Sequence, residues 1–191
     1  MKIKRKSNKY NILFCHGFRH SPSQKEDIIF NTLTHNLPKN IKLDYIDLDD
    51  ENPIDSYNRL KKVQGKYDMV IGFSMGGFFA ELSEIPCKIL VNPGYHMPKY
   101  LELMRIHKGL DIKDKSIEEF KKLSKGLFKY KPDRILGVFG TNDFKVGTSG
   151  DFIKHHGKDN IVWFTGGHVI DENSIKQLML PFILNHFNEN N

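Results

Sequence analysis

The chain has 191 residues, with 29 Lys and Arg against 23 Asp and Glu, and its formal net charge is +6 at pH 7. This length fits one domain with a substantial hydrophobic core and leaves little room for two. The only cysteines, Cys15 and Cys87, lie inside apolar runs. We therefore expect buried free thiols in a reducing compartment rather than a disulfide framework.

The apolar and charged segments limit the expected location and partners. The basic N-terminus is followed by a short apolar run, residues 12–15, which is too short for a signal peptide, and the longest mostly apolar window, residues 69–80, is too short for a membrane span. We expect a soluble, cytoplasmic protein without a membrane partner. The basic residues between Lys99 and Arg134 alternate with acidic ones, so a solvated surface is favoured over a nucleic-acid site.

The first half of the chain alternates between strand and helix signals after a flexible arm at residues 1–9. An apolar run ending at His16-Gly17 is typical of a buried parallel strand, and Ser23 with Glu26 three residues later forms a capping-box pattern for a helix start. In chain order we predict a strand at 10–15, a helix with the stripe Ile29, Leu33 and Leu37, a strand at 41–48, a helix from Pro53 to Gly65, a strand at 68–73 and a helix through 78–82.

The second half interrupts this alternation and then resumes it. About residues 95–131 carry two helical patterns between strands, where a small helical cap or lid over a pocket would lie. In chain order we predict a strand at 87–91, helices near 100–107 and 116–127, strands at 134–139 and 161–164, and an amphipathic helix from Glu172 with a kink at Pro181. The pattern predicts a single α/β domain over residues 1–191, with a mostly parallel sheet and helices on both faces.

The sequence Gly72-Phe73-Ser74-Met75-Gly76-Gly77 follows the apolar strand at 68–73. A G-x-S-x-G pattern at this place can put a serine hydroxyl on a sharp bend between a strand and a helix, exposed to a substrate. The flanking glycines let the strand and the helix pass closely. A single match of this kind also fits an ordinary turn, so its meaning depends on partner residues elsewhere.

Suitable partners follow two later strands. In parallel sheets the functional residues gather at the carboxyl ends of the strands, and Ser74, Asp143 and His168 all lie at such ends. Serine needs a base to take its proton, and the imidazole needs a carboxylate to orient it. Asp151 is a nearby competitor for the acid, and Asn92, after the fourth strand, cannot supply the negative charge.

The backbone around these residues predicts an oxyanion hole. The N–H of Met75 begins the helix after Ser74, where the helix dipole favours negative charge, and the N–H of Phe18 follows the first strand. His16 is interpreted as a residue that shapes its loop by hydrogen bonds. Neither the pair His16 and His20 nor the pair His155 and His156 shows zinc-protease spacing with a glutamate between, so we predict no metal and no cofactor.

The linked motifs together resemble one protein family. The histidine-glycine after the first strand, Gly72–Gly77, Asn92-Pro93, residues 140–143 and Gly166-Gly167-His168 are similar to those of the α/β-hydrolase fold. More narrowly, they resemble the small bacterial esterases of the YqiA-like (UPF0227) family, over roughly residues 11–170. This resemblance implies a small serine esterase, while residues 95–133 carry no matching motif.

The expected function is hydrolysis of a small-molecule carboxylic ester or thioester through an acyl-enzyme on Ser74. An acyltransferase or another hydrolase on the same triad remains an alternative, because water access and pocket shape decide the acceptor. A protein that keeps the fold without catalysis, as a binding module, is the alternative from another class. In the 95–131 segment, Tyr95, Met97, Tyr100, Leu101 and Met104 fit either a pocket lining or ordinary helix packing.

Overall fold

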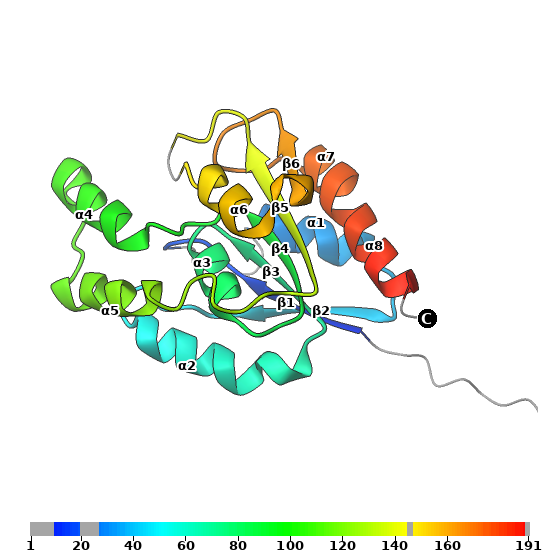
Figure 1. The fold of residues 1–191 in the computed structure, drawn as a ribbon, viewed down its shortest axis with the longest axis horizontal. Coiled ribbons are helices and arrows are strands. Elements are labelled where there is room, and N and C mark those ends of the chain that lie inside the picture. The colour runs from blue at the N-terminus through cyan, green and yellow to red at the C-terminus, as the bar shows by residue number, and fades with distance from the viewer. Residues whose placement is uncertain (1–9, 20–26, 145–146, 190–191) are drawn as a thin grey trace, which may run out of the picture.

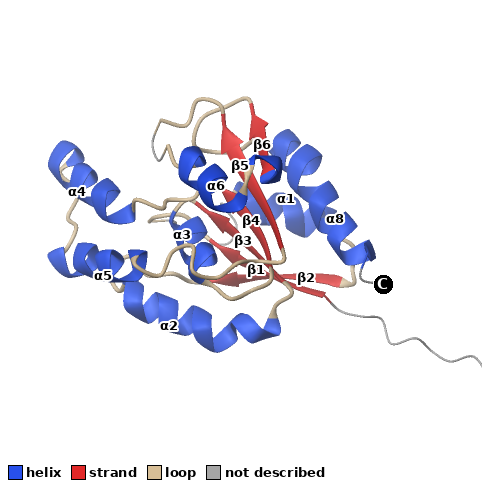
Figure 2. Ribbon diagram, in the orientation of Figure 1, coloured by secondary structure: helices blue, strands red, loops and turns tan. Residues whose placement is uncertain are grey.

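The computed structural model describes residues 10–19, 27–144 and 147–189. Its centre is a six-stranded sheet in the order β2-β1-β3-β4-β5-β6, and every neighbouring pair is parallel (Figures 1 and 2). The strands are β1 (Tyr10–Cys15), β2 (Ile41–Ile46), β3 (Met69–Phe73), β4 (Cys87–Val91), β5 (Arg134–Gly140) and β6 (Ile161–Phe164). The strand order reverses between β1 and β3, which is the kind of switch point where such sheets bind ligands.

Helices cover both faces of this sheet, as the sequence pattern predicts. The eight α-helices are α1 (Ile28–Asn36), α2 (Pro53–Val63), α3 (Met75–Leu82), α4 (Met97–Lys108), α5 (Asp114–Ser124), α6 (Ser149–His156), α7 (Glu172–Ser174) and α8 (Leu180–Glu189) in the described part of the chain. Short 3₁₀ turns cover Gln64–Lys66 and Lys158–Asn160. A π-helical segment, Ile175–Met179, joins α7 to α8.

Alternate residues of each strand feed two separate cores. On one face, Leu13 and Leu90 pack with side chains of α2, α3, α5 and α6. On the other face, Ile12 and Ile89 pack with α1 and with the C-terminal helices. This alternation is the two-residue period of a strand, and burial on both faces explains why the sequence reads as continuous apolar runs.

Most predicted elements are present, with shifts at their ends. The strands at 87–91 and 161–164 have the predicted bounds, and the alternating segment at 41–48 is a strand only as far as Ile46. The predicted capping box at 23–26 lies outside the described residues. The helix cap in the structure is Asp27, whose carboxylate accepts from the N–H groups of Ile29 and Phe30.

The C-terminal helix changes its winding ahead of Pro181 rather than at the proline alone. In the π-helical segment the Leu180 N–H bonds the Ile175 carbonyl, five residues back. Because a proline has no N–H to donate to the preceding turn, a wider turn just before it accommodates the lost bond. The expected irregularity near Pro181 therefore takes the form of a π segment.

The two helices between β4 and β5 have different environments. α5 belongs to the main core, because Phe120 is fully buried against Phe78 and Phe79, at ring-centroid distances of 5.3 Å and 5.8 Å. α4 extends at the edge of the molecule beside α5 (Figure 1). This segment thus combines a core helix with a more exposed one.

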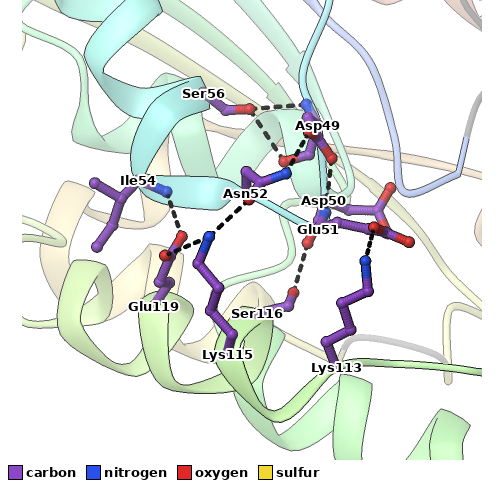
Figure 3. A network of polar contacts seen from close by, with 10 residues as sticks. All are labelled: Asp49, Asp50, Glu51, Asn52, Ile54, Ser56, Lys113, Lys115, Ser116 and Glu119. Atoms are coloured by element: carbon purple, nitrogen blue, oxygen red, sulfur yellow. Dashed lines mark hydrogen bonds and ion pairs between the residues drawn. The ribbon is translucent and has the colours of Figure 1, made fainter.

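A polar network also fastens α5 to the loop that precedes α2 (Figure 3). The carboxylate of Glu119 accepts a 3.0 Å hydrogen bond from the N–H of Ile54 and so satisfies a free donor in the first turn of α2. Lys113 pairs with Glu51, and the Ser116 hydroxyl donates to the carbonyl of Asp50. α5 is therefore held by both apolar and polar contacts.

Candidate active site

Ser74 lies on a strained bend between β3 and α3. Its backbone angles are φ 53° and ψ −115°, in a region that side-chain-bearing residues rarely adopt. A Cβ on Gly72 would lie 2.5 Å from the Gly76 carbonyl oxygen, and a Cβ on Gly76 would lie 1.9 Å from the Cys15 carbonyl oxygen. Only glycine fits at these positions, so the sequence pattern and the bend have the same steric cause.

The structure brings the three predicted site residues into one hydrogen-bonded chain. Nε2 of His168 lies 2.9 Å from Oγ of Ser74, and Nδ1 of His168 lies 2.9 Å from Oδ2 of Asp143. The side chains of His168 and Asp143 are only 11% and 5% exposed, which limits competition from water for both bonds. With Nδ1–H donated to the carboxylate, Nε2 is left free to accept the serine proton.

Asn92 supports this arrangement in a way that the sequence analysis does not anticipate. Its fully buried side chain donates from Nδ2 to the His168 carbonyl at 2.8 Å and accepts at Oδ1 from the Gly140 N–H at 3.0 Å. It therefore joins the end of β4 to the end of β5 and to the loop that carries His168. The one sequence feature that could have pointed to this role is the position of Asn92-Pro93 directly after a buried strand.

The predicted oxyanion groups lie at adjoining backbone segments. Met75 begins α3, and Phe18 lies in the loop directly after β1. The backbone of Gly76 approaches this loop closely, since a Cβ on Gly76 would lie 1.9 Å from the Cys15 carbonyl oxygen and 2.6 Å from that of His16. Among the described residues, no backbone carbonyl accepts a hydrogen bond from the N–H groups of Phe18 and Met75. They remain available to a developing negative oxygen.

The remaining candidate histidine near the site, His16, has a structural role. Its Nε2 accepts a hydrogen bond from the Leu48 N–H at 2.9 Å, so Nδ1 carries the proton and donates to the Gly17 carbonyl at 2.7 Å. The ring also stacks on Tyr45, with 5.2 Å between centroids. These contacts agree with the interpretation that His16 shapes its loop.

The alternative acid, Asp151, and the other histidines make contacts outside the site. Asp151 bonds Nε2 of His96 at 2.9 Å, which leaves Asp143 as the carboxylate that contacts His168. His155 stacks on Phe128, and Nε2 of His156 lies 3.1 Å from the buried carboxylate of Glu81. His20 lies outside the described residues.

A small, mostly apolar pocket opens between α4 and the loop that carries the acid. It has a volume of about 200 Å³ and is lined by Gly94, Tyr100, Leu103 and Phe144, with His96 and Lys99 also contributing. Burial, together with the nearby charge of Asp143, raises the pKa of the Tyr100 hydroxyl. Of the five apolar residues noted in this segment, Tyr95, Met97 and Leu101 are buried in the core and Met104 packs against it. Tyr100 packs against the core and also lines the pocket.

The described part of the chain contains neither a metal-binding cluster nor a membrane-spanning helix. No group of three His, Cys, Asp or Glu side chains there is placed to hold a metal ion. None of the helices in that part of the chain combines the length and the apolar character needed to cross a membrane.

Comparison with known proteins relates this chain to solved structures only. No family model matches the sequence, and no curated protein sequence matches it. Est1E from Butyrivibrio proteoclasticus is similar over 95% of this chain and 91% of its own, with a TM-score of 0.68 at 16% identity. Alpha/beta hydrolase domain-containing protein 10 from mouse covers 95% and 90%, with a TM-score of 0.66 at 14% identity.

A third similar structure is the monoacylglycerol lipase of Paleococcus ferrophilus, which covers 92% of this chain and 94% of its own, with a TM-score of 0.58 at 16% identity. Est1E has also been solved with ferulic acid bound. At these identities the likeness concerns the fold. The chain has the α/β-hydrolase fold, as its six parallel strands and their flanking helices indicate.

Proposed function

We propose that this protein is a serine hydrolase that cleaves small carboxylic esters or thioesters through an acyl-enzyme on Ser74. The observation that carries the proposal is the continuous contact from Ser74 through His168 to Asp143, with 2.9 Å at each step. A serine, an imidazole and a carboxylate in this order are the groups that nucleophilic acyl transfer needs. The α/β-hydrolase fold of esterases and lipases supports the same reaction class.

In the first half of the reaction, Oγ of Ser74 attacks the ester carbonyl carbon while Nε2 of His168 takes the hydroxyl proton. Asp143 stabilises the resulting imidazolium, and the N–H groups of Met75 and Phe18 stabilise the negative oxygen. Collapse of the tetrahedral intermediate breaks the bond to the alcohol or thiol, which leaves with the proton from His168. Water then repeats these steps on the acyl-enzyme and releases the acid.

Substitution of the nucleophile tests the proposal directly. Ser74→Ala and His168→Ala should each lower kcat/KM for 4-nitrophenyl butyrate by at least about 10³-fold, because the triad acts as a unit. His155→Ala, which changes a histidine outside the site, serves as the control and should hydrolyse the ester at nearly the parent rate. If Ser74→Ala is as active as the parent, Ser74 is not the nucleophile.

The pH profile tests the base separately. Hydrolysis should slow at acidic pH, because a histidine base works only in its neutral form and an imidazolium cannot accept the serine proton. The profile should be measured as kcat/KM on the folded parent protein, with circular dichroism at each pH to exclude unfolding. A rate that stays constant down to acidic pH would reject a histidine base.

Covalent labelling distinguishes the proposed function from its alternatives. A fluorophosphonate should modify Ser74 in the parent and leave Ser74→Ala unmodified, whereas a non-catalytic binding module would not react. A hydrolase and an acyltransferase differ in the acceptor, which added alcohols would reveal as new ester products. Membership of the YqiA-like family, the cytoplasmic location and the assignment of 95–131 as a cap remain predictions of the sequence.

A further inference from the structure

We propose that Arg19 is a positioning residue for the proposed reaction: it ties the loop after β1 to the connection between α4 and α5, and so holds the Phe18 N–H where the negative oxygen develops. This inference rests on the proposed function, because it assigns a role beside the predicted oxyanion hole. The residue that Arg19 bonds, Asp111, lies 92 residues further along the chain. Arg19 itself acts through the backbone and does not touch the substrate.

The Phe18 N–H belongs to the peptide group that joins Gly17 to Phe18. The carbonyl of this group accepts the 2.7 Å hydrogen bond from Nδ1 of His16. The group is trans, so its N–H points away from its carbonyl, and the bond limits the directions that the N–H can take. His16 holds only the inner side of the loop, however. The outer side begins at Arg19, the next residue.

The backbone of Arg19 has a left-handed conformation, with φ 51°. This conformation is uncommon for residues other than glycine, and arginine lacks the short polar side chain that lets asparagine or aspartate adopt it more readily. A residue keeps such a strained conformation only where its surroundings hold it. The turn at Arg19 therefore depends on contacts with the rest of the protein.

Two contacts of the Arg19 side chain hold this turn. Its Nη2 donates a 2.7 Å hydrogen bond to the carbonyl of Asp111. Its guanidinium carbon lies 5.4 Å from the ring centroid of Phe18, within the range of a cation–π contact. The Phe18 ring in turn meets Tyr100 edge to face, with 6.3 Å between centroids. Phe18 and Arg19 together are thus fastened to α4 and to the segment that follows it.

The acceptor of this hydrogen bond lies on a well-held part of the backbone. Ile112, the residue after Asp111, is 8% exposed and belongs to the main core. At the start of α5, the Ser116 hydroxyl donates to the Asp50 carbonyl (Figure 3). Burial raises the pKa of the Asp50 carboxyl, and the nearby positive charge of Arg19 opposes this rise. Arg19 therefore lies between two segments that are themselves bonded together.

The sizes of two effects distinguish this role from a contribution to stability. Arg19 is exposed, and a single hydrogen bond or cation–π contact at the surface adds little to the free energy of unfolding. Removal of one oxyanion donor, by contrast, lowers kcat by about 10²–10³-fold. A donor that is displaced rather than removed should cost less, roughly tenfold. We therefore expect a large effect on rate and a small effect on stability.

The main experiment compares the steady-state hydrolysis of 4-nitrophenyl butyrate by the parent and three variants. Arg19→Asn tolerates the left-handed φ but is too short to reach the Asp111 carbonyl, so kcat should fall roughly tenfold while KM changes little. Arg19→Lys keeps a long cationic donor and should recover most of the lost rate. Arg105→Asn, which removes an exposed ion pair to Asp114 beside the same connection, should match the parent.

Two further measurements separate a displaced N–H from unfolded or inactive protein. Labelling with fluorophosphonate to completion gives the fraction of chains with a reactive Ser74, and the urea midpoint of Arg19→Asn should stay close to that of the parent. An alkyl trifluoromethyl ketone reports on the oxyanion hole: Oγ of Ser74 adds to its carbonyl carbon, the hydroxyl proton passes to His168, and a negative oxygen remains. Its inhibition constant should rise by about the same factor as kcat/KM falls.

Three results would overturn the inference: an unchanged kcat in Arg19→Asn, a raised KM with unchanged kcat, which would mean that Arg19 binds the substrate directly, or an equal loss in Arg19→Lys. Failure of the proposed function would look different. In that case the parent cleaves no ester and fluorophosphonate does not label Ser74, and both conclusions fall together. If the parent is labelled and active while kcat does not respond to Arg19, only the role of Arg19 fails.

Discussion

At the scale of single residues, the site depends on two unusual backbone conformations at neighbouring strand ends. Ser74, after β3, has φ 53°, and Asn92, after β4, has φ 41°. Serine and asparagine cost less there than β-branched residues would, yet both are strained relative to an extended strand. The Ser74 N–H bonds the Val91 carbonyl, and the Gly94 N–H bonds the Ser74 carbonyl. The two strand ends therefore hold each other in place.

The first prediction at this scale concerns Asn92. Asn92→Gly tolerates the positive φ but removes the hydrogen bonds to the Gly140 N–H and the His168 carbonyl. We expect the free energy of unfolding to fall by about 1–3 kcal/mol, because two buried polar groups lose their partner. We also expect kcat to fall more than KM rises, because His168 would be less well oriented.

Urea denaturation and steady-state kinetics of the same preparation would check both effects. Asn92→Ala adds the cost of a positive φ and should be less stable than Asn92→Gly. If Asn92→Gly keeps the parent stability and kcat, the side chain of Asn92 does not support the site.

At the scale of elements, the two helices in the segment predicted as a cap differ: α5 belongs to the core, and α4 is more exposed. α5 buries Phe120 against α3, the helix that directly follows Ser74, and its polar contacts reach α2. α4 keeps the Leu103 side chain exposed next to the pocket. We therefore expect α5 to unfold with the main core.

The prediction for α5 is a large loss of stability on truncation of its central side chain. Phe120→Ala should lower the free energy of unfolding by about 3–5 kcal/mol, because it leaves a cavity among Phe78 and Phe79. Lys122→Ala, at an exposed position of the same helix, should change it by less than about 0.5 kcal/mol. Urea denaturation measures both. A loss below about 1 kcal/mol for Phe120→Ala would mean that α5 is only loosely attached.

The elements also show how far the sequence determines the fold. Strands such as residues 87–91 are predicted with their bounds because both faces are buried and glycine or proline lies nearby. α6 is missed, because it begins at Ser149-Gly150 and buries only Phe152, so its apolar period is too weak to recognise. Its position depends on tertiary packing of Phe152 against Phe139, at 5.5 Å between ring centroids.

The sequence predicts part of the candidate site and misses part of it, as it does for the fold. The contact among Ser74, Asp143 and His168 was predictable because all three follow strands of one parallel sheet, and their catalytic roles stay a proposal. The sequence favours Asp143 over its competitor Asp151, and the structure agrees in that Asp143 contacts His168 while Asp151 contacts His96. The role of Asn92 needed coordinates, because it acts through contacts 48 and 76 residues away in sequence.

At the scale of the whole molecule, one positively charged side chain, Lys88, is buried in the protein interior. Lys88 lies in the middle of the buried strand β4 and is fully buried. Its ammonium donates 2.8 Å hydrogen bonds to the carbonyls of Glu81 and Ser83 at the C-terminal end of α3, and it lies 5.1 Å from the ring centroid of Tyr130. A cation at this end of a helix satisfies free carbonyls and complements the helix dipole.

Burial lowers the pKa of Lys88 from the usual 10.5 to about 8, an effect that the nearby Glu81 opposes in part. Between these two pH values the unfolded chain, with an exposed lysine, binds one more proton than the folded protein. The contribution of Lys88 to the free energy of unfolding therefore rises with pH from about 8 to about 10.5. Below pH 8 the folded state carries the full cost of the buried charge.

The comparison of the parent with Lys88→Met isolates this effect, because the other titrating groups are common to both proteins. The stability of the parent relative to Lys88→Met should rise across this pH window by up to about 3 kcal/mol, since each unit of pKa difference corresponds to about 1.4 kcal/mol. Urea denaturation at several pH values measures the difference, with Lys122→Met as a control expected to give a flat line. A flat line for Lys88→Met as well would mean that Lys88 stays protonated in the folded protein, with its hydrogen bonds to the end of α3 outweighing its burial.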